Sequence, residues 1–369
     1  MEHEFTKTKA LIAMSGGVDS SVSAMLTKEA GYDCIGCTMK LYRNELITPE
    51  GEDPKTKTCC AADDVADARS VAARLDIPFY VFNFEEDFER EVIRPFVECY
   101  RKGQTPNPCI ECNRHLKFDR LLKRAEELGC DILVTGHYAR IREEGGRYHL
   151  YRAADPTKDQ SYVLYSLTQE QLAHIRFPLG DMTKDEARSI AEAHGFVNAH
   201  KPDSQDICFV PDGDYASVIE RYTGEKTVPG SFVDLDGKVM GQHRGIIHYT
   251  IGQRRGLGLS VPESVYVCRI CPKENTVVLG HNEDLMSTTV HVEHVNWTSG
   301  KTPSEAFDCE AKIRYRQPAR PARVTPTGPD SIIIEFAEAQ RAITPGQAAV
   351  LYLGDEVLGG GTIFDPAAG

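Results

Sequence analysis

The first two hundred residues alternate short apolar runs with longer amphipathic segments. The apolar runs predict strands at residues 9–14, 33–39, 78–84 and 132–135. The amphipathic segments predict helices at residues 20–30, 61–75, 85–100 and 115–128. Strands that alternate with helices indicate an α/β domain, in which helices cover both faces of a parallel sheet. Ligands of such sheets bind beyond the carboxyl ends of the strands, where the strand order reverses.

The pattern changes after about residue 205. Residues 213–263 are Gly-rich and irregular, and later apolar runs predict short strands at residues 290–297, 311–316, 331–336, 348–353 and 357–363. Turn residues separate these strands, as in a small antiparallel barrel or sandwich. A chain of 369 residues fits two or three domains. We interpret it as a parallel-sheet domain at residues 1–205, a small central domain at 206–280 and a C-terminal antiparallel β-barrel at 281–369.

The charge of the chain gives two opposing indications. The formal net charge is −13, which argues against a nucleic acid partner. The basic residues are nevertheless grouped in three clusters: Arg114, Lys117, Arg120, Lys123 and Arg124; Lys238, Arg244, Arg254 and Arg255; and Lys312, Arg314, Arg316, Arg320 and Arg323. Any one cluster is equally compatible with ordinary solvated surface. Three clusters on an acidic chain favour a face that follows the phosphates of a nucleic acid.

Membrane insertion and secretion are not expected. The chain has no apolar run of about 18 residues, and its charged N-terminus lacks the apolar region of a secretory signal. Its twelve Cys residues are too sparse for a disulfide scaffold, so clustered cysteines indicate metal or sulfur chemistry. We expect a cytoplasmic protein.

A glycine-rich loop joins the first predicted strand to the first predicted helix. It consists of Ser15, Gly16, Gly17, Val18, Asp19 and Ser20. Two glycines allow the backbone to approach an anion, and the helix N-terminus supplies N–H groups and a positive dipole end. No Lys follows, which excludes a Walker A loop. Asp19 is a suitable residue to help hold Mg²⁺ between phosphates.

Three cysteines stand out by their surroundings. Cys109 and Cys112 form a Cys-x-x-Cys pair, which we place in a loop before a helix, where it could bind a metal or form a redox pair. Cys208 lies in a polar segment at the inferred domain boundary. The pairs at residues 34/37 and 268/271 share the spacing but lie in predicted strands, where such side chains point to opposite faces and belong to the core. The role of residues 59–60, also cysteines, stays open.

The loop resembles that of the pyrophosphate-loop (PP-loop) ATPases. That superfamily has an adenine nucleotide alpha hydrolase-like domain, cleaves ATP between its α and β phosphates, and adenylates a carbonyl oxygen. The resemblance implies ATP and Mg²⁺ as cofactors, but it does not identify the substrate.

Nine ordered segments resemble the tRNA-specific 2-thiouridylases over nearly the whole chain. They are SGGVDSSV at 15–22, TMKLY at 38–42, NPCIECN at 107–113, TGHYAR at 135–140, DPTKDQSYVLY at 155–165, KPDSQDICF at 201–209, YTIGQRRGLG at 249–258, RYRQ at 314–317 and TPGQAAVLY at 344–352. A small-molecule synthetase would share only the first. The resemblance implies transfer of sulfur to the wobble uridine of tRNA, after ATP has adenylated uracil O2, with release of AMP and pyrophosphate. The target base must leave the anticodon stack to react.

The resemblance also implies roles for individual residues. An ATP site is implied at Ala13, Met14, Ser15, Gly16, Gly17, Val18, Asp19, Ser20, Met39 and Gly136. Contacts with the anticodon stem-loop of tRNA are implied at Asn107, Pro108, Cys109, His137, Lys158, Asp159, Gln160, Arg314, Tyr315 and Gln347. Cys112 matches the catalytic nucleophile, and Cys208 matches the persulfide carrier, which a sulfur-donor protein would load. The small central domain is expected to bind tRNA.

Cys109 departs from some members of the family, which have Asp at this position. With Cys112 and Cys208 it gives three candidate thiolates, and three Cys ligands that leave one iron open would suit a [4Fe–4S] cluster. A persulfide mechanism and a cluster mechanism therefore both remain open. Two other function classes are less favoured. The basic clusters and the barrel disfavour a small-molecule PP-loop synthetase, and the intact loop with Asp19 disfavours a non-catalytic tRNA-binding or metal-carrier protein.

Overall fold

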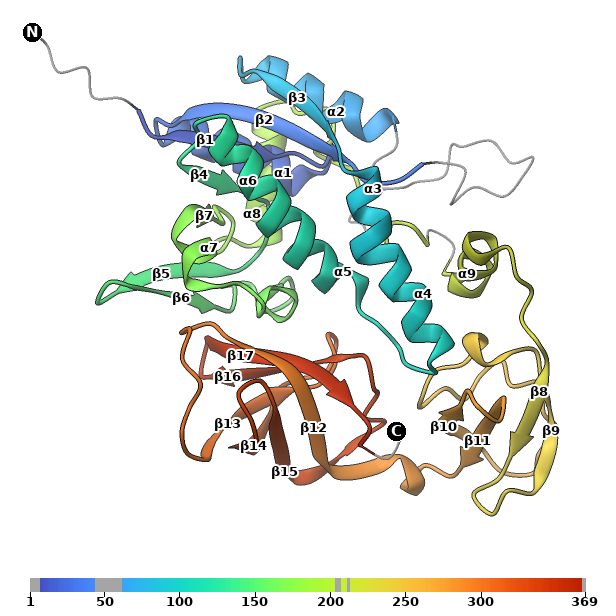
Figure 1. Ribbon diagram of the computed structural model, residues 1–369. Helices are drawn as coiled ribbons and strands as arrows, with labels where there is room; N and C mark the ends of the chain where they lie inside the picture. The colour runs from blue at the N-terminus through green and yellow to red at the C-terminus, as the bar shows by residue number, and fades with distance from the viewer. Residues whose placement is uncertain (1–6, 44–61, 203–206, 211–212, 367–369) are drawn as a thin grey trace, which may run out of the picture.

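The N-terminal part of the chain is built around a five-stranded parallel sheet (Figure 1). The computed structural model describes residues 7–43, 62–202, 207–210 and 213–366. The strand order is β3-β2-β1-β4-β7. The bounds are Lys9–Ala13 for β1, Asp33–Lys40 for β2, Phe79–Asn83 for β3, Ile132–Val134 for β4 and Ile175–Arg176 for β7. Every neighbouring pair runs parallel, which confirms the predicted α/β domain.

The strand order reverses at β1. The chain continues from β1 to β2 on one side, whereas β4 pairs with the other side of β1. The segment that leaves β1 therefore lies at the crevice where sheets of this type bind ligands. The four predicted strands correspond to β1–β4 within two residues at each end. β7 has only two residues, too few to give a periodic signal in the sequence.

Helices bury both faces of the sheet. Alternate residues of a strand point to opposite faces, so Leu11 belongs to one core cluster and its neighbours Ala10 and Ile12 belong to another. The second cluster includes residues of α1 at Val18–Glu29, α2 at Ala62–Arg74 and α8 at Lys184–Ala193. The helix predicted at residues 61–75 is thus α2, which brings Ala68 and Ala72 into this core as expected.

Two long helical rods contribute to the first cluster. One combines α3 at Glu85–Phe88, a π-helical turn at Glu89–Ile93 and α4 at Arg94–Arg101. The other combines α5 at Pro108–Glu111, a π-helical segment at Cys112–Arg120 and α6 at Leu121–Glu127. The second rod begins seven residues before the predicted helix at residue 115. Pro108 obscures this start in the sequence, although proline is favoured in the first turn because the N–H group it lacks would have no partner there.

The middle part of the chain forms a small sheet of its own. After α9 at Tyr215–Thr223, four strands pair in the order β10-β11-β8-β9. They cover Gly230–Val233 (β8), Val239–His243 (β9), Tyr266–Cys271 (β10) and Thr276–Gly280 (β11). The prediction of irregular structure at residues 213–263 is therefore wrong for α9, β8 and β9. Short strands interrupted by a bulge give little periodicity, which explains the error.

The C-terminal part forms a six-stranded antiparallel barrel, which confirms the prediction. Its strands are β12 at Met286–Trp297, β13 at Phe307–Lys312, β14 at Arg320–Pro326, β15 at Ile332–Arg341, β16 at Ala348–Leu353 and β17 at Glu356–Phe364. Pairing of β12 with β17 closes the barrel. The strand predicted at residues 311–316 is shifted, since β13 ends at Lys312. β14 was hidden because it begins with Arg-Pro and only Ala322 and Val324 are buried.

A hairpin from the N-terminal part extends the barrel sheet. It consists of β5 at Arg140–Glu144 and β6 at Arg147–Tyr151, and Tyr151 pairs with Glu356 of β17. The backbone N–H of Arg152 donates to the carbonyl of Asp355 at 2.8 Å. These bonds join the barrel to a hairpin of the N-terminal part of the chain.

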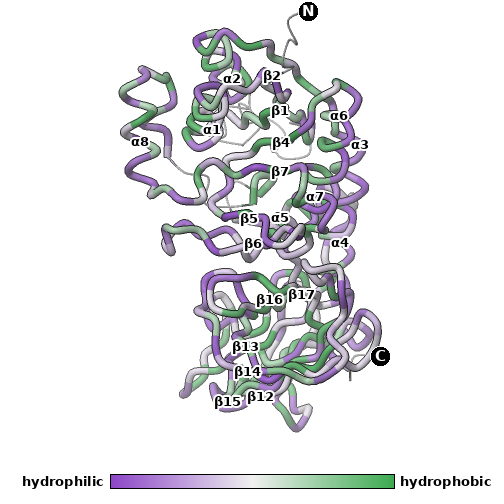
Figure 2. Tube along the Cα trace, turned by 90° about the vertical axis from the view of Figure 1, so that its left-hand side faces the viewer, coloured by the Kyte–Doolittle hydropathy of each residue, from purple (hydrophilic) through white to green (hydrophobic). Residues whose placement is uncertain are grey.

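The apolar residues lie mainly along the strands of the N-terminal sheet and the barrel, and the connecting segments are more hydrophilic (Figure 2). None of the described helices combines the length and the apolar character that crossing a membrane requires.

Candidate functional site

The loop between β1 and α1 holds the predicted nucleotide-binding residues, and its shape depends on Gly16. Gly16 has φ +76°, and a Cβ atom there would lie 2.3 Å from the carbonyl oxygen of Asp64. Both the left-handed backbone and the close approach of α2 exclude a side chain. Gly17 is different, because its φ is −89° and only the hydroxyl of Ser15 would lie near an added Cβ.

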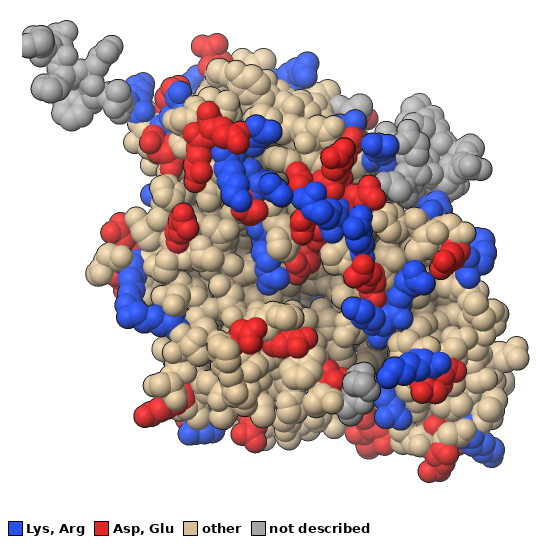
Figure 3. Space-filling model, viewed as in Figure 1, with Lys and Arg blue, Asp and Glu red and all other residues tan. Residues whose placement is uncertain are grey.

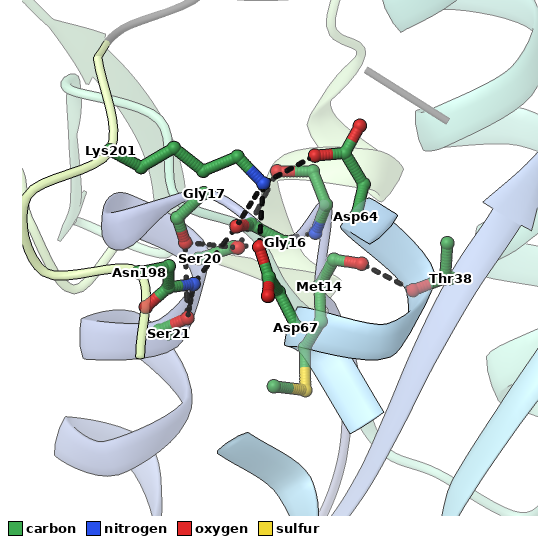
Figure 4. A network of polar contacts seen from close by, with 11 residues as sticks. Met14, Gly16, Gly17, Ser20, Ser21, Thr38, Asp64, Asp67, Asn198 and Lys201 are labelled. Carbon is green, nitrogen blue, oxygen red and sulfur yellow. Dashed lines mark hydrogen bonds and ion pairs between the residues drawn. The ribbon is translucent and has the colours of Figure 1, made fainter. Parts of the chain in front are cut away.

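Serine hydroxyls close the loop onto the first turn of α1 (Figure 4). Ser20 and Ser21 both donate to the carbonyl of Gly17 at 3.0 Å. The backbone N–H of Ser15 donates to Ser20 Oγ at 3.1 Å. The loop is thereby held at the N-terminus of a twelve-residue helix, where backbone N–H groups and the helix dipole favour an anion.

Asn198 and Lys201 both contact this loop, and Lys201 also connects it to α2 (Figure 4). The amide nitrogen of buried Asn198 donates to the carbonyl of Gly16 at 2.9 Å. Lys201 Nζ lies 2.7 Å from Asp67 Oδ2, contacts Asp64 Oδ1 at 2.5 Å and reaches the Gly16 carbonyl at 3.4 Å. The loop is therefore fixed from two sides by side chains that follow α8 in sequence.

Asp19 is held by a buried cation. Lys184 Nζ donates to both carboxylate oxygens of Asp19, at 2.7 and 2.8 Å, and the hydroxyl of Tyr138 donates to Oδ1 at 2.8 Å. The Lys184 side chain is 7% exposed and that of Asp19 is 32% exposed. Tyr138 is itself positioned by Gln160, whose Oε1 accepts its backbone N–H at 2.9 Å.

The other predicted nucleotide residues line the same crevice. A Cβ on Gly136 would lie 2.8 Å from the backbone nitrogen of Ser20, so the end of β4 requires glycine to pass the start of α1. Thr38 Oγ1 donates to the carbonyl of buried Met14 at 2.5 Å, and half-buried Met39 follows in β2. The structure thus brings the predicted ATP residues together at the carboxyl ends of β1, β2 and β4.

Cys109 and Cys112 lie at the start of the second helical rod. Asn107 precedes the helix, Pro108 is buried in its first turn, Cys109 is exposed and Cys112 is half-buried. The prediction that this motif lies in a loop is therefore wrong. Positions three apart on a helix share a face, so the two side chains still lie on the same side.

The barrel anchors the segment that leads to this helix. Gln347 Nε2 donates to the carbonyl oxygens of Thr105 and Pro106, at 2.8 and 3.2 Å. The backbone N–H of Thr105 donates to the carbonyl of Pro345 at 2.9 Å. Gln347, predicted to contact tRNA, thus holds the approach to the cysteine helix in place.

Cys208 is positioned by aromatic packing. The hydroxyl of Tyr42 donates to the carbonyl of Cys208 at 3.1 Å. The next residue, Phe209, is buried and meets Phe96 and Phe88 edge to face, with ring centroids 5.1 and 5.7 Å apart. Cys208 therefore lies next to the first helical rod, through the packing of Phe209 on it. The preceding residues 203–206 lie outside the described part.

The three cysteines do not form a metal site in this structure. Across the described residues, no three His, Cys, Asp or Glu side chains lie close enough to hold one metal ion. Cys112 and Cys208 both pack against the same core cluster, whereas Cys109 is exposed. A [4Fe–4S] cluster held by all three cysteines therefore stays a prediction.

His137, predicted to contact tRNA, is buried. It is 7% exposed, its Nδ1 lies 2.7 Å from Thr135 Oγ1, and its ring packs between Phe118 and Phe177. Burial, assisted by the charge of Lys117, lowers the pKa of His137 well below 6.5. A neutral His137 supports the second rod, and its contact with tRNA stays a prediction.

Two other predicted tRNA residues have internal partners as well. The carboxylate of Asp159 accepts the backbone N–H groups of Ala153 and Ser161, each at 3.1 Å. Gln160 binds the backbone of Tyr138 as described above, and Lys158 is half-buried. These residues shape the segment behind Asp19, and their predicted contacts with tRNA remain untested.

Arg314 and Tyr315 differ in accessibility. Arg314 Nη2 donates to the carbonyls of Ala342 and Ile251, at 3.0 and 3.2 Å, and burial lowers the pKa of its guanidinium. Arg314 therefore joins the barrel to the middle sheet. Tyr315 is 39% exposed, and its hydroxyl donates to the carbonyl of Asp159 at 3.5 Å.

The three basic clusters also differ. In the first, Arg114, Arg120, Lys123 and Arg124 pair with Glu111, Asp87, Asp119 and Glu127 respectively. Lys and Arg side chains accordingly lie among Asp and Glu side chains over the helical rods (Figure 3). The other two clusters provide six exposed cations without an ion pair to any described residue: Lys238, Arg244, Arg254, Arg255, Arg316 and Arg320. The first cluster is solvated surface, and the other two fit phosphates better.

The remaining cysteine pairs behave in two ways. Cys34 and Cys37 lie on opposite faces of β2 in different core clusters, as predicted, and burial raises the pKa of Cys34 to about 11 and also raises that of Cys37. Cys268 and Cys271 are in β10, but they are half-buried and do not belong to the core. Residues 59–60 lie outside the described part.

Several site residues were not predicted from the sequence. Asn198 and Lys184 carried no motif, since the Thr-Lys-Asp-Glu run at residues 183–186 signals only a capped helix start. Tyr138 and Lys201 belong to the segments TGHYAR and KPDSQDICF, which could have marked them.

Comparisons with known proteins cover nearly the whole chain. Residues 8–212 match the family model described as tRNA methyl transferase HUP domain, residues 216–281 the tRNA methyl transferase PRC-barrel domain, and residues 287–363 the aminomethyltransferase beta-barrel domain. The tRNA-specific 2-thiouridylase MnmA of Carboxydothermus hydrogenoformans is 49% identical over 359 residues, 97% of this chain and 98% of that protein. The enzyme of the same name from Clostridioides difficile is 49% identical over 362 residues, 97% and 99% of the two chains.

A solved structure, a 4-thiouridine synthetase–RNA complex with bound ATP, is 18% identical over 58% of this chain and 50% of that chain. Its TM-score of 0.34 is too low to carry an argument. Identity of 49% over 97% of the chain shows the family, and the three-part fold agrees with it. The chain belongs to the family of tRNA-specific 2-thiouridylases.

Proposed function

We propose that the protein replaces the 2-oxygen of a tRNA wobble uridine with sulfur at the expense of ATP. The observation that carries the proposal is the nucleotide loop. It lies at the point where the strand order reverses, at the N-terminus of α1, and side chains from α8 and from the segment that follows α8 hold it. Its full-length relatives are named for the same reaction.

The first half of the reaction activates the base. Uracil O2 attacks the α-phosphorus of ATP, and pyrophosphate leaves toward the loop, where the N-terminus of α1 favours an anion. Mg²⁺, which ATP carries on its phosphates, offsets part of the charge. The product is an O-adenylated uracil, whose AMP group is a much better leaving group than oxide.

The second half transfers sulfur. A persulfide on Cys208 attacks C2 with its terminal sulfur, and AMP leaves with the former 2-oxygen. Cys112 then attacks the Cys208 sulfur as a thiolate. The bond between the two persulfide sulfurs breaks, the transferred sulfur becomes the thiocarbonyl, and Cys112 and Cys208 are left as a disulfide. An external thiol reductant reopens the disulfide, and a sulfur-donor protein reloads Cys208. The scheme requires the two cysteines to approach each other during turnover.

The tRNA is expected to lie across the exposed cations of the middle sheet and the barrel. Arg254 and Arg255 are exposed after the loop that Arg314 holds, and Arg316 and Arg320 are exposed on the barrel. Such residues neutralise phosphates and release counterions. ATP and tRNA as substrates imply a cytoplasmic reaction.

The test measures whether AMP formation is coupled to 2-thiouridine formation in tRNA. We expect unmodified tRNA to stimulate conversion of ATP to AMP, and mass spectrometry of digested tRNA to show one 2-thiouridine for each turnover when a persulfide donor is present. If AMP formation does not respond to tRNA, the protein is a small-molecule PP-loop synthetase instead.

A further inference from the structure

The nucleotide loop contains an electrostatic conflict, which Lys184 resolves. Asp19 lies in the first turn of α1, the position toward which the loop would direct an anion. A carboxylate stabilises a helix N-terminus, but it repels a second anion placed beside it. At about 4 Å, two like charges near a protein surface repel by roughly 4 kcal/mol. A loop that accepts pyrophosphate therefore needs a positive charge next to Asp19.

Lys184 provides that charge from a fixed position. Its ammonium group donates to both oxygens of Asp19, and the residue is only 5% exposed. Thr183 caps α8, and the backbone N–H of Lys184 donates to Asp155 Oδ2 at 3.2 Å. The ammonium also lies 6.0 Å from the centre of the Tyr138 ring. A lysine held at both its backbone and its charged end is not a mobile surface residue.

Lys201 does not serve the same purpose. It faces two carboxylates, those of Asp64 and Asp67, so the group it completes keeps a net negative charge. Among the described residues, Lys184 faces one carboxylate, that of Asp19, and the two charges of this pair cancel. Removal of Lys184 would therefore leave an uncompensated negative charge at the N-terminus of α1.

We propose that Lys184 is a positioning and charge-compensating residue of the nucleotide site, which neutralises Asp19 so that the loop can bind pyrophosphate before any metal ion is present. The inference rests on the proposed function, because it assigns the loop to the pyrophosphate that adenylation releases. Asp19 then acts first as the partner that orients Lys184, and a metal ion that arrives with ATP adds to an already neutral pair.

The test measures binding of inorganic pyrophosphate to the full chain by calorimetry, in EDTA. We expect measurable binding by the wild type and a loss of about tenfold or more in Lys184→Met, which keeps the length of the side chain but removes its charge. Asp19→Asn should bind pyrophosphate more tightly than the wild type. The double variant Asp19→Asn/Lys184→Met, which leaves no unpaired charge, should return close to wild-type affinity.

Three controls separate charge from folding. Lys184→Arg should retain most of the affinity, and Tyr138→Phe, which removes a hydrogen bond from Asp19 without changing charge, should lose less than Lys184→Met. Lys226→Met removes an exposed lysine that pairs with Glu220, and it should bind like the wild type. If Lys184→Met does not fold, the comparison of Asp19→Asn with the double variant still isolates the lysine charge.

Equal pyrophosphate affinity in the wild type and Lys184→Met would overturn the inference, and so would a wild type that binds no pyrophosphate without metal. The proposed function is judged separately by AMP formation with tRNA in the same wild-type preparation. Pyrophosphate binding as predicted without AMP formation would reject the proposed function and leave the role of Lys184 intact.

Discussion

The nucleotide loop and the cysteine segments are organised in opposite ways. At the loop, Gly16, Ser21 and Asp19 are each held by contacts from other elements, and Lys184, Lys201 and Asn198 supply them. Near the cysteines, the described contacts are made by neighbouring residues: Gln347 fixes the approach to Cys112, and Phe209 anchors Cys208. Among the described residues, no three His, Cys, Asp or Glu side chains lie close enough to hold one metal ion.

The difference matches the two halves of the proposed reaction. Pyrophosphate binding needs a fixed set of donors, because preorganised dipoles stabilise charge without rearrangement. Sulfur transfer needs a carrier cysteine that meets a donor protein, the base and Cys112 in turn, which a fixed metal centre would prevent. The comparison therefore favours the persulfide scheme over a cluster.

The largest expected effect is the loss of thiolation in cysteine variants that still adenylate tRNA. Cys112→Ser and Cys208→Ser should each abolish thiolation but retain tRNA-stimulated adenylation, because neither residue belongs to the nucleotide loop. Cys109→Ser is the matched control, since it removes an exposed thiol of the same helix. It should keep substantial activity under anaerobic purification. Parallel loss of iron and thiolation in Cys109→Ser would restore the cluster mechanism.

A pair of glycine substitutions tests the rigidity of the nucleotide loop. Gly16→Ala introduces a Cβ 2.3 Å from the Asp64 carbonyl at a positive φ, so it should destabilise the protein by about 1–3 kcal/mol and slow AMP formation about 100-fold. Gly17→Ala should leave thermal stability nearly unchanged, since its φ is ordinary and its surroundings are open. Binding of tRNA should be preserved in both. Equal effects of the two substitutions would show that the close approach at Gly16 is not what fixes the loop.

The tRNA face can be tested with arginines of different accessibility. Replacing exposed Arg316 and Arg320 by Gln should weaken tRNA binding about tenfold and lower the salt slope by about two. Arg314→Gln should mainly reduce thermal stability, because its guanidinium binds carbonyls of the barrel and the middle sheet. The affinity of each variant is measured at several salt concentrations. An unchanged slope in the exposed pair would mean that this side of the barrel does not follow phosphates.

A smaller effect is expected from Gln347, which holds the segment before the helix that carries Cys109 and Cys112. Gln347→Leu removes two hydrogen bonds to the segment before Pro108 and leaves carbonyl groups without their donors, at a cost of about 1 kcal/mol. We expect the KM for tRNA to rise about fivefold, with tRNA-independent ATP binding unchanged. A fall in ATP affinity of the same size would show that the barrel contact supports the nucleotide loop as well.

The smallest effect concerns acid stability. The folded pKa of His137 is lowered, so its neutral form contributes stability fully above about pH 6.5 and loses it as pH falls toward the folded pKa. His137→Phe fits the aromatic surroundings and should reduce the acid loss of unfolding free energy by roughly 1 kcal/mol. Urea unfolding at about pH 7.5 and pH 5.5 measures the difference. The same acid loss in both proteins would assign the sensitivity to other groups.

Much of the molecule followed from local patterns, and the failures have physical causes. Strands β1 to β4 were predictable because parallel strands buried on both faces read as continuous apolar runs. The Gly-rich loop was predictable because its function depends on the backbone. Lys184 and Asn198 were not, because they reach Asp19 and Gly16 from more than 160 positions away, and no local pattern reports such a contact. The bonds from Arg314 to backbone carbonyls were also not predictable, and its contact with tRNA stays a prediction.

The most direct test of the account is the fate of tRNA on a protein that can activate but cannot thiolate. Cys208→Ser, which lacks the persulfide carrier, is purified anaerobically, assayed with ATP and persulfide donor and quenched within one turnover, and its tRNA is digested and analysed by mass spectrometry. We expect adenylated wobble uridine, or its AMP-forming hydrolysis, with no 2-thiouridine, and no iron in the wild-type enzyme. Absence of both the adenylate and tRNA-dependent AMP in Cys208→Ser, while the wild type forms 2-thiouridine, would contradict the separation of the loop from the cysteines.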